Sequence, residues 1–213
     1  MRSLLQILLI SLLALPLACS AAKKNKGLVE VRKRVPGVMV DLRYSTTQNV
    51  LGRPVYPPNM PCLLRASTAK KLKKAQTQLK RQGYGIKIWD AWRPPEAHQL
   101  LFGQADSSGM FLDPIHGWSR HCGGISIDAT LVDLQGREQR MPTAFDEDLH
   151  QASSHQQPKD PEIRRNLTLL HEAMTEAGFK PLPGEWWHFD DLEFLYRRIP
   201  VIRAKDVGVK IIE

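Results

Sequence analysis

Two short segments of the chain carry residue types that bind metal ions. The first, WSRHCGGISIDATLVD, covers residues 118–133 and contains His121 and Asp128, seven positions apart. Imidazole nitrogen and carboxylate oxygen are both ligands that Zn²⁺ accepts in proteins. Taken alone, the pair is a weak motif that fits two ordinary polar surface residues better than a metal site, so the metal interpretation needs further residues.

The second segment, GEWWHFDD, covers residues 184–191 and contains Glu185 and His188. A catalytic zinc ion commonly has three protein ligands and a water, and a nearby carboxylate is needed to accept a proton from that water. With His121 and Asp128, His188 completes a set of three ligands. Glu185 supplies the carboxylate. The two segments together predict a site for one zinc ion per chain at which a water is activated.

Strand geometry sets a condition on the first segment. Residues 125–132 alternate in polarity, which predicts a half-buried strand with Asp128 on its polar face. A continuous strand would point His121 to the opposite face. Gly123 and Gly124 have the backbone freedom to form a turn that brings His121 back over Asp128.

Strand alternation sets a similar condition on the second segment. Side chains of a strand alternate between its faces, so Glu185 and His188 would lie on opposite sides. We expect the turn at Gly184 to rotate Glu185 inward. Trp186 and Trp187 lie between the two polar residues, and this pattern fits either a water-excluding wall of the site or a plain core strand.

Two helices are expected to support these strands. Residues 67–82 and 161–177 carry apolar stripes at helical spacing, and a glycine suited to a left-handed cap follows each of them. Ser67 and Asp160 are the expected N-caps, because their side chains can accept hydrogen bonds from the first turn.

A strand-to-helix junction carries a guanidinium group. The segment YGIKIWDAW, residues 84–92, begins with strand alternation, and Pro94 and Pro95 suit the first turn of a further helix that follows it. Arg93 lies at the junction, three positions after Asp90. Helices and separate strands without regular alternation favour an α+β fold. We expect a single domain with a small central antiparallel sheet flanked by helices, because the length suits one core.

The first 22 residues have the pattern of an export signal. An uncharged apolar run at residues 4–17 follows an early arginine and ends in small residues. The expected division is therefore a signal peptide at 1–22 and a catalytic domain at 23–213. The motif LPLAC, which ends at Cys19, also resembles a lipoprotein processing box. Pro16 stands where that box usually has leucine, so cleavage among the small residues 18–22 is the favoured outcome and a lipid on Cys19 the alternative. We expect an exported protein of the periplasm or cell envelope, for which such a lipid would be the only membrane contact.

The chain is basic, with a net charge of +8. Several lysines cluster on the helix expected at residues 67–82, namely Lys70, Lys71, Lys73, Lys74 and Lys80. Aromatic residues do not alternate with them, so a solvated helix face fits this cluster better than a nucleic-acid surface. We therefore expect no nucleic-acid partner.

Cysteine usage leaves one pairing open. Cys19 belongs to the leader region, so Cys62 and Cys122 remain as a pair that could bridge in an oxidising compartment. Sequence does not show whether their Cα atoms come close enough for a disulfide. The oligomeric state is left open in the same way.

The two segments resemble the signatures of a known enzyme family. SRHCGGISID and EWWHFD are similar to the S-x-H-x-x-G-x-[AS]-x-D and E-x-x-H motifs of the zinc D-alanyl-D-alanine dipeptidases, the VanX-like branch of the D,D-peptidases. Residues 41–56, 89–97 and 141–155 are similar to further segments of that family in the same order. The resemblance covers most of residues 40–199. Cys122 and Gly123 depart from the residues that the family usually has there.

The resemblance implies the D,D-peptidase/hedgehog-like fold, with the zinc site on the sheet, and a role for each site residue. The implied zinc ligands are His121, Asp128 and His188; the implied catalytic residues are Glu185 as general base and Arg93 as oxyanion stabiliser; the implied substrate-binding residues are Asp146, near the ammonium group, and Ser119, near the carboxylate.

The implied function is zinc-dependent hydrolysis of the D-alanyl-D-alanine dipeptide to D-alanine in cell-wall turnover or recycling. One alternative is a D,D-carboxypeptidase or peptidoglycan endopeptidase of the same fold, which would need a more open groove at the loops before His121 and after Met141. Another is a non-catalytic wall-binding protein. That class is expected to have lost a ligand or the base, whereas this sequence keeps all of them.

Overall fold

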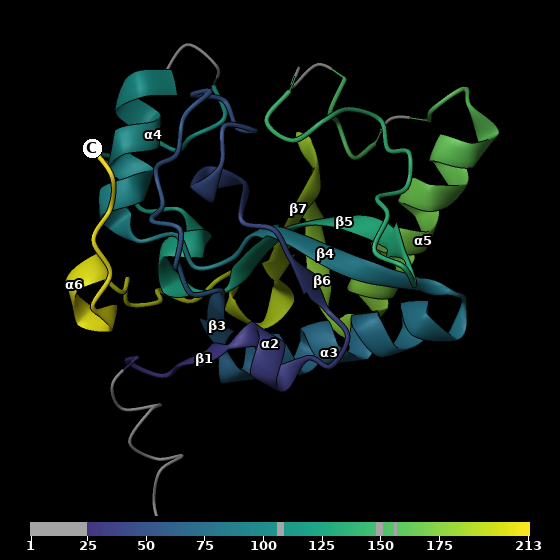
Figure 1. Ribbon diagram of the computed structural model, residues 1–213, viewed down its shortest axis with the longest axis horizontal. Helices are drawn as coiled ribbons and strands as arrows, with labels where there is room; N and C mark the ends of the chain where they lie inside the picture. The colour runs from purple at the N-terminus through teal and green to yellow at the C-terminus, as the bar shows by residue number, and fades with distance from the viewer. Residues whose placement is uncertain (1–24, 106–108, 148–150, 156) are drawn as a thin grey trace, which may run out of the picture.

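The computed structural model describes residues 25–105, 109–147, 151–155 and 157–213 (Figure 1). The expected signal peptide and Cys19 lie outside the described residues. In the described ranges, no helix has both the length and the apolar character needed to cross a membrane.

A five-stranded sheet forms the centre of the fold, with the strand order β2-β4-β5-β7-β6. Its strands are β2 (Met39–Val40), β4 (Tyr84–Asp90), β5 (Ser126–Asp133), β6 (Phe179–Leu182) and β7 (Glu185–Asp191). All neighbours in this sheet are antiparallel except β2 and β4, which are parallel. A second, antiparallel sheet consists of β1 (Leu28–Glu30) and β3 (Leu63–Arg65). The α+β fold expected from the sequence is confirmed, with the parallel β2 as an addition to it.

The long helices lie on both sides of the central sheet. They are α3 (Ala66–Arg81), α4 (Pro95–Ala105) and α5 (Pro161–Ala177); the short ones are α2 (Val31–Arg34), α6 (Ala204–Val207), and the 3-10 helices η1 (Arg43–Ser45), η3 (Arg120–Gly123) and η4 (Leu192–Phe194). Helices α3 and α5 pack against each other and against the sheet, whereas α4 lies away from them at the upper left of Figure 1.

Helix α5 follows the sequence pattern closely, and α3 departs from it at one end. Asp160 caps α5 by accepting hydrogen bonds from the first-turn backbone, and Gly178 ends it with φ 104°. The expectation that Ser67 caps α3 is wrong, because Ser67 lies inside its first turn and Arg65 is the N-cap. Strand β3 ends at Arg65 and α3 begins at the next residue, so the chain changes direction at Arg65. The backbone N–H of Arg65 donates a hydrogen bond to Gly124 O.

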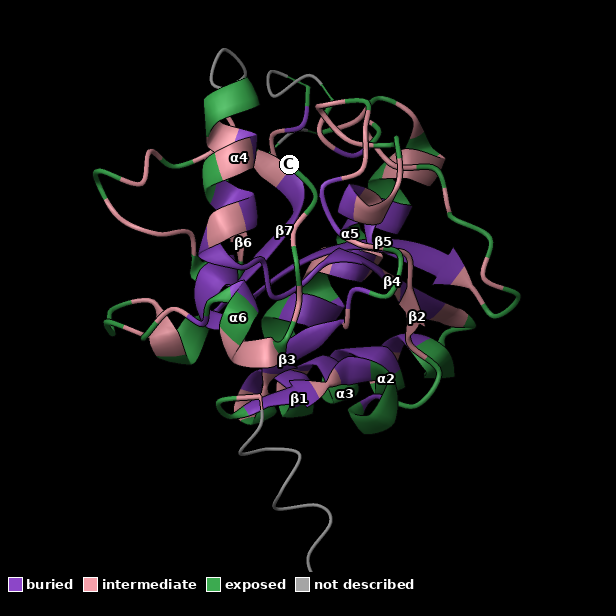
Figure 2. Cartoon of the chain, turned by 60° about the vertical axis from the view of Figure 1, so that its left-hand side comes forward, coloured by how far each residue is buried: buried purple, intermediate pink, exposed green. Residues whose placement is uncertain are grey.

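Strand β5 is buried on both faces, not half-buried as its alternation predicted (Figure 2). Ile127, Ala129 and Leu131 belong to the hydrophobic core. On the polar face, Asp128 is 2% exposed and Thr130 is 1% exposed. Loops that the strand pattern could not reveal cover this face, and the covered polar face is where the candidate site lies.

Cys62 and Cys122 are both buried free thiols, so the bridge left open by the sequence is not formed. Burial raises the pKa of Cys62 well above its usual value and raises that of Cys122 to about 12. Since the thiolate is the reactive form, both side chains act as small apolar residues of the interior.

Candidate active site and metal centre

His121 reaches the site from the short helix η3, not from a plain loop. Ser119 caps this helix, because its Oγ accepts a hydrogen bond from the backbone N–H of His121 (3.3 Å). Gly124 then turns the chain into β5 with φ 69°, and a Cβ at this position would lie 2.5 Å from Leu28 Cδ2. The predicted return of His121 over Asp128 therefore occurs, and Gly124 provides the left-handed turn.

A strand irregularity, and not the Gly184 turn, brings Glu185 to the same pocket as His188. In the β6–β7 pair, Pro181 lies opposite Phe189 but Leu182 lies opposite Glu185, so the register shifts within β7. Such a bulge breaks strict alternation and re-aims a side chain. Glu185 Oε2 consequently lies 4.0 Å from His188 Nδ1.

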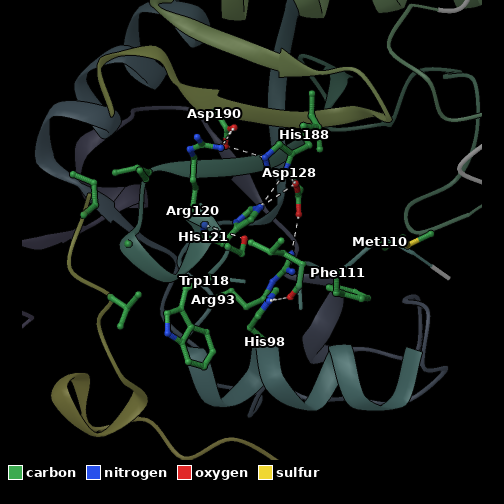
Figure 3. Close-up of a pocket in the computed structure, with 18 of the residues that line it drawn as sticks. Arg93, His98, Met110, Phe111, Trp118, Arg120, His121, Asp128, His188 and Asp190 are labelled. Carbon is green, nitrogen blue, oxygen red and sulfur yellow. Dashed lines mark hydrogen bonds and ion pairs between the residues drawn. The ribbon is translucent and has the colours of Figure 1, made fainter. Parts of the chain in front are cut away.

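Three donor atoms converge at the floor of the pocket (Figure 3). His188 Nδ1 lies 2.9 Å from Asp128 Oδ1 and 3.2 Å from His121 Nε2, and His121 Nε2 lies 3.3 Å from Asp128 Oδ1. Strand pairing places Asp128 directly opposite His188. Two imidazoles and one carboxylate are a donor set suited to a divalent transition metal, so these residues fit a metal ion.

Asp128 is ready to act as an anionic ligand. Burial opposes its ionisation, yet His121 and His188 together hold the pKa of this carboxyl well below its usual range. Its second oxygen, Oδ2, accepts a hydrogen bond from Arg93 Nη2 (3.3 Å). Asp128 thus turns one oxygen toward the two imidazoles and uses the other to hold a guanidinium. His121, Asp128 and His188 together are called the metal-binding group below.

Hydrogen bonds behind the ligands set which ring nitrogens face the metal-binding group. His121 Nδ1 lies 2.6 Å from Ala91 O, which only an N–H can approach favourably. His188 Nε2 lies 3.0 Å from Asp190 Oδ1, an oxygen that also accepts a hydrogen bond from Ser126 (2.6 Å). These contacts leave Nε2 of His121 and Nδ1 of His188 as the atoms that could bind a metal ion.

Asp190 is a site residue that sequence reasoning missed. Burial opposes its ionisation, but the hydrogen bond from His188 lowers the pKa of Asp190 to about 2. Arg120 Nη1 donates a further hydrogen bond to its Oδ2 (3.1 Å). The available signal was its position two residues after His188 on one strand, which places both side chains on the same face.

Arg93 is buried between two carboxylates and two aromatic rings. Its Nε donates to Asp90 Oδ2 (2.8 Å), so Asp90 orients it, and its Cζ lies 4.9 Å from the Tyr44 ring centroid and 5.4 Å from that of Phe111. Burial disfavours the charged form, but Asp90 and Asp128 keep the pKa of Arg93 well above its usual value. The guanidinium is thus a fixed positive charge in the pocket wall.

One pocket of about 630 Å³ is lined by all the candidate site residues: Arg93, Ser119, His121, Asp128, Asp146, Glu185 and His188. Burial raises the pKa of Glu185, and it raises that of Asp146 to about 7. Asp146 has φ 57°, and its carboxylate accepts hydrogen bonds from Tyr44 Oη and from the backbone N–H of Val50 (3.3 Å each).

Several tryptophan and histidine residues near the site do not belong to the metal-binding group. Trp186 and Trp187 are fully buried core residues, so they do not form the pocket wall that the sequence pattern allowed. His116 lines the pocket but is not part of the metal-binding group. His98 is buried and bonded through Nε2 to Leu112 O (2.8 Å), and burial lowers its pKa to about 4.

Replacing a metal-binding histidine should remove the metal, whereas replacing a nearby histidine should not. We expect His188→Ala to lower bound metal from one ion per chain to a small fraction of that, because only two of three donors remain. His116→Ala is the matched control and should keep full occupancy. Metal analysis of both folded variants after dialysis measures the difference, and equal occupancy in the two would contradict the assignment.

Asp190→Asn should weaken metal binding without removing a ligand. The carboxylate orients His188 and raises the basicity of its ring, and loss of such a partner typically costs about 10- to 100-fold in metal affinity. Titration with a competing chelator measures the affinity. Asp133→Asn, on the same sheet but paired with Arg137 at the surface, is the control and should bind as the unchanged protein does.

The chain matches the family model described as D-ala-D-ala dipeptidase over residues 24–107 and 113–202. A D-alanyl-D-alanine dipeptidase of Escherichia coli (strain K12) is 32% identical over 164 residues, which cover 76% of this chain and 83% of that protein. D-alanyl-D-alanine dipeptidases of Enterococcus faecium and Streptomyces coelicolor are each 29% identical and cover 73% and 75% of this chain and 86% and 88% of their own lengths. The chain therefore belongs to the D-ala-D-ala dipeptidase family of metallopeptidases.

Proposed function

We propose that this protein is a zinc-dependent dipeptidase that hydrolyses D-alanyl-D-alanine to D-alanine. The observation that carries the proposal is that Glu185, Arg93 and the metal-binding group open into the same pocket. The names of the relatives supply the substrate. An N-terminal export signal would place the reaction in the periplasm or cell envelope, where it would serve wall turnover or recycling.

His121, Asp128 and His188 would hold the zinc ion. When bound, it would polarise the scissile carbonyl and lower the pKa of a coordinated water. A set of two histidines and one carboxylate leaves a coordination position open for that water, as catalytic zinc sites require. The network around Asp190 keeps the His188 ring oriented for this arrangement, and Ala91 O does the same for the His121 ring.

Glu185 would accept the proton of the attacking water and return it to the leaving amine. Its carboxylate lies next to His188, and its pKa is raised by burial. A general base works best when its pKa approaches the working pH, since it must both take up and release the proton. Burial of Glu185 therefore serves both halves of the proton transfer.

Arg93 would stabilise negative charge on the carbonyl oxygen as the tetrahedral intermediate forms. The guanidinium is always charged and is held by Asp90, so it needs no reorganisation during the reaction. Its contact with Asp128 places it beside the metal-binding group. Negative charge on the carbonyl oxygen would thus be stabilised by both the Arg93 guanidinium and the metal ion.

Asp146 would bind the ammonium group of the substrate, and Ser119 would lie near its carboxylate. The Asp146 carboxylate is covered by Tyr44 and by the backbone of Val50. A peptide extended beyond its amino group would have to displace these contacts, whereas a free dipeptide would not. This favours a dipeptidase over a carboxypeptidase with the same metal site.

Cleavage of the free dipeptide by the intact enzyme, and its loss in Glu185→Gln, test the function. We expect alanine release from D-Ala-D-Ala to fall by roughly 10²- to 10⁴-fold in this variant, because general-base catalysis is lost while the metal ligands remain. The assay is run beside a pentapeptide wall precursor, and metal content is measured in both proteins. Alanine release from the pentapeptide alone would reject the dipeptidase assignment in favour of a carboxypeptidase.

The affinity for substrate should depend on pH through Asp146. Its raised pKa of about 7 means that the carboxyl becomes neutral as the pH falls below that value, and a neutral acid binds ammonium poorly. We expect KM to rise by up to roughly tenfold per pH unit on the acid side. KM measured across this range in the unchanged enzyme and in Asp146→Asn gives the check: the variant should have a high KM at every pH. A KM in the unchanged enzyme that does not vary with pH would contradict this role.

A further inference from the structure

Two arginines at the mouth of the pocket have no part in the mechanism above. Arg197 and Arg198 are exposed residues that line the pocket together with Ile199 and Val201. They lie on the C-terminal segment, residues 195–202, which passes Arg120 and Trp118 as the yellow ribbon of Figure 3. This wall lies on the Ser119 side of the metal-binding group.

The backbone of this segment is held at both ends, so the two arginines are presented from a fixed position. The bonds are Arg120 Nη2 to Leu195 O (2.9 Å), Arg65 Nη2 to Pro200 O (3.1 Å) and Ile202 N to Cys122 O (2.9 Å). Ile199 also packs on Gly123, where a Cβ would approach its Cγ2 to 3.0 Å. The segment is therefore attached to the same short helix that carries His121.

The guanidinium groups of these arginines are largely free to meet a ligand. Arg197 has only a long ion pair with Glu193, at 3.8 Å. Arg198 forms no ion pair with any residue in the described part of the chain. Arg120, by contrast, already donates to Asp190. Two available cations thus border one side of the pocket.

The pocket has opposite charges on its two sides. The Asp146 carboxylate lies at the side formed by Tyr44 and Arg93. Arg197 and Arg198 belong instead to the segment that is bonded to Arg120 and packs on Gly123, at the helix that carries His121. A dipeptide has the same polarity, with its ammonium group at one end and its carboxylate at the other. A carboxylate on the leaving residue would consequently face the two arginines.

We propose that Arg197 and Arg198 form a carboxylate-binding subsite for the leaving residue of the substrate, an inference that rests on the proposed dipeptidase function. Guanidinium groups match carboxylates in shape and charge and stay protonated at every working pH. The carboxylate can come from the C-terminus of the peptide or from an acidic side chain on its second residue. The subsite would therefore favour D,D-dipeptides that carry negative charge on the leaving side.

Four substrates separate the two sources of the carboxylate. D-Ala-D-Ala is compared with its C-terminal amide, and D-Ala-D-Glu is compared with D-Ala-D-Gln. Each is assayed with the unchanged enzyme, with Arg197→Gln/Arg198→Gln, and with Lys205→Gln/Lys210→Gln. The lysine pair removes the same charge from the same part of the chain and does not line the pocket.

We expect the arginine variant to raise KM about three- to tenfold for a substrate that carries the bound carboxylate, with kcat within about twofold, because exposed ion pairs are individually weak. A substrate that lacks the bound carboxylate should be unaffected, and the lysine variant should behave as the unchanged enzyme.

If KM rises for D-Ala-D-Ala but not for its amide, and rises equally for D-Ala-D-Glu and D-Ala-D-Gln, the subsite binds the C-terminus. If KM rises for D-Ala-D-Glu alone, the subsite binds the side chain. Equal KM changes for charged and uncharged partners in both pairs, or no change at all, would overturn the subsite while leaving the dipeptidase function intact. If the unchanged enzyme cleaves none of the four substrates, the proposed function fails and the subsite fails with it.

Discussion

The pairing of β5 with β7 places Asp128 directly opposite His188, and the remaining features of the site depend on this one register. A shift by one residue would move both side chains to the face that packs on α5, because side chains alternate along a strand. The apolar partners on that face prevent the shift, since Ile127 and Phe189 face each other in the same pair and are both fully buried. The core therefore specifies the position of the candidate metal ligands as well as the stability of the sheet.

Charged groups buried beside the ligands are tolerated because each is paired. Arg93 lies between Asp90 and Asp128, and Tyr56 Oη donates a hydrogen bond to the other oxygen of Asp90 (2.9 Å). A buried charge without a partner would cost several kcal/mol, on the order of the stability of a whole domain. The network thus holds the guanidinium in place before any substrate arrives, so little of the cost of positioning it falls on the reaction.

Features governed by local sequence could be predicted, and features set by distant packing could not. The ends of α5 follow from Asp160 and Gly178, which act within a few residues of the helix they bound. The convergence of His121, Asp128 and His188 followed from motif spacing. The role of Asp190 depends on Ser126 and on Arg120, far away in sequence. The cover over the polar face of β5 also arises from tertiary contacts, so alternation alone predicted too much exposure for that face. The bulge within β7 has the same origin, so alternation alone located the rotation of Glu185 at the wrong residue.

The same tertiary contacts explain how a small pocket can distinguish the two ends of its substrate. Asp146 is partly buried, which would strengthen its interaction with an ammonium group because less water screens it. The arginine side is exposed, so each ion pair there is weak and depends on salt. Binding would then be dominated by the amino end, while the carboxyl side would tolerate variation in the leaving residue. In the proposed enzyme, the partly buried carboxylate would recognise the substrate, and the exposed arginines would tolerate variation in its second residue.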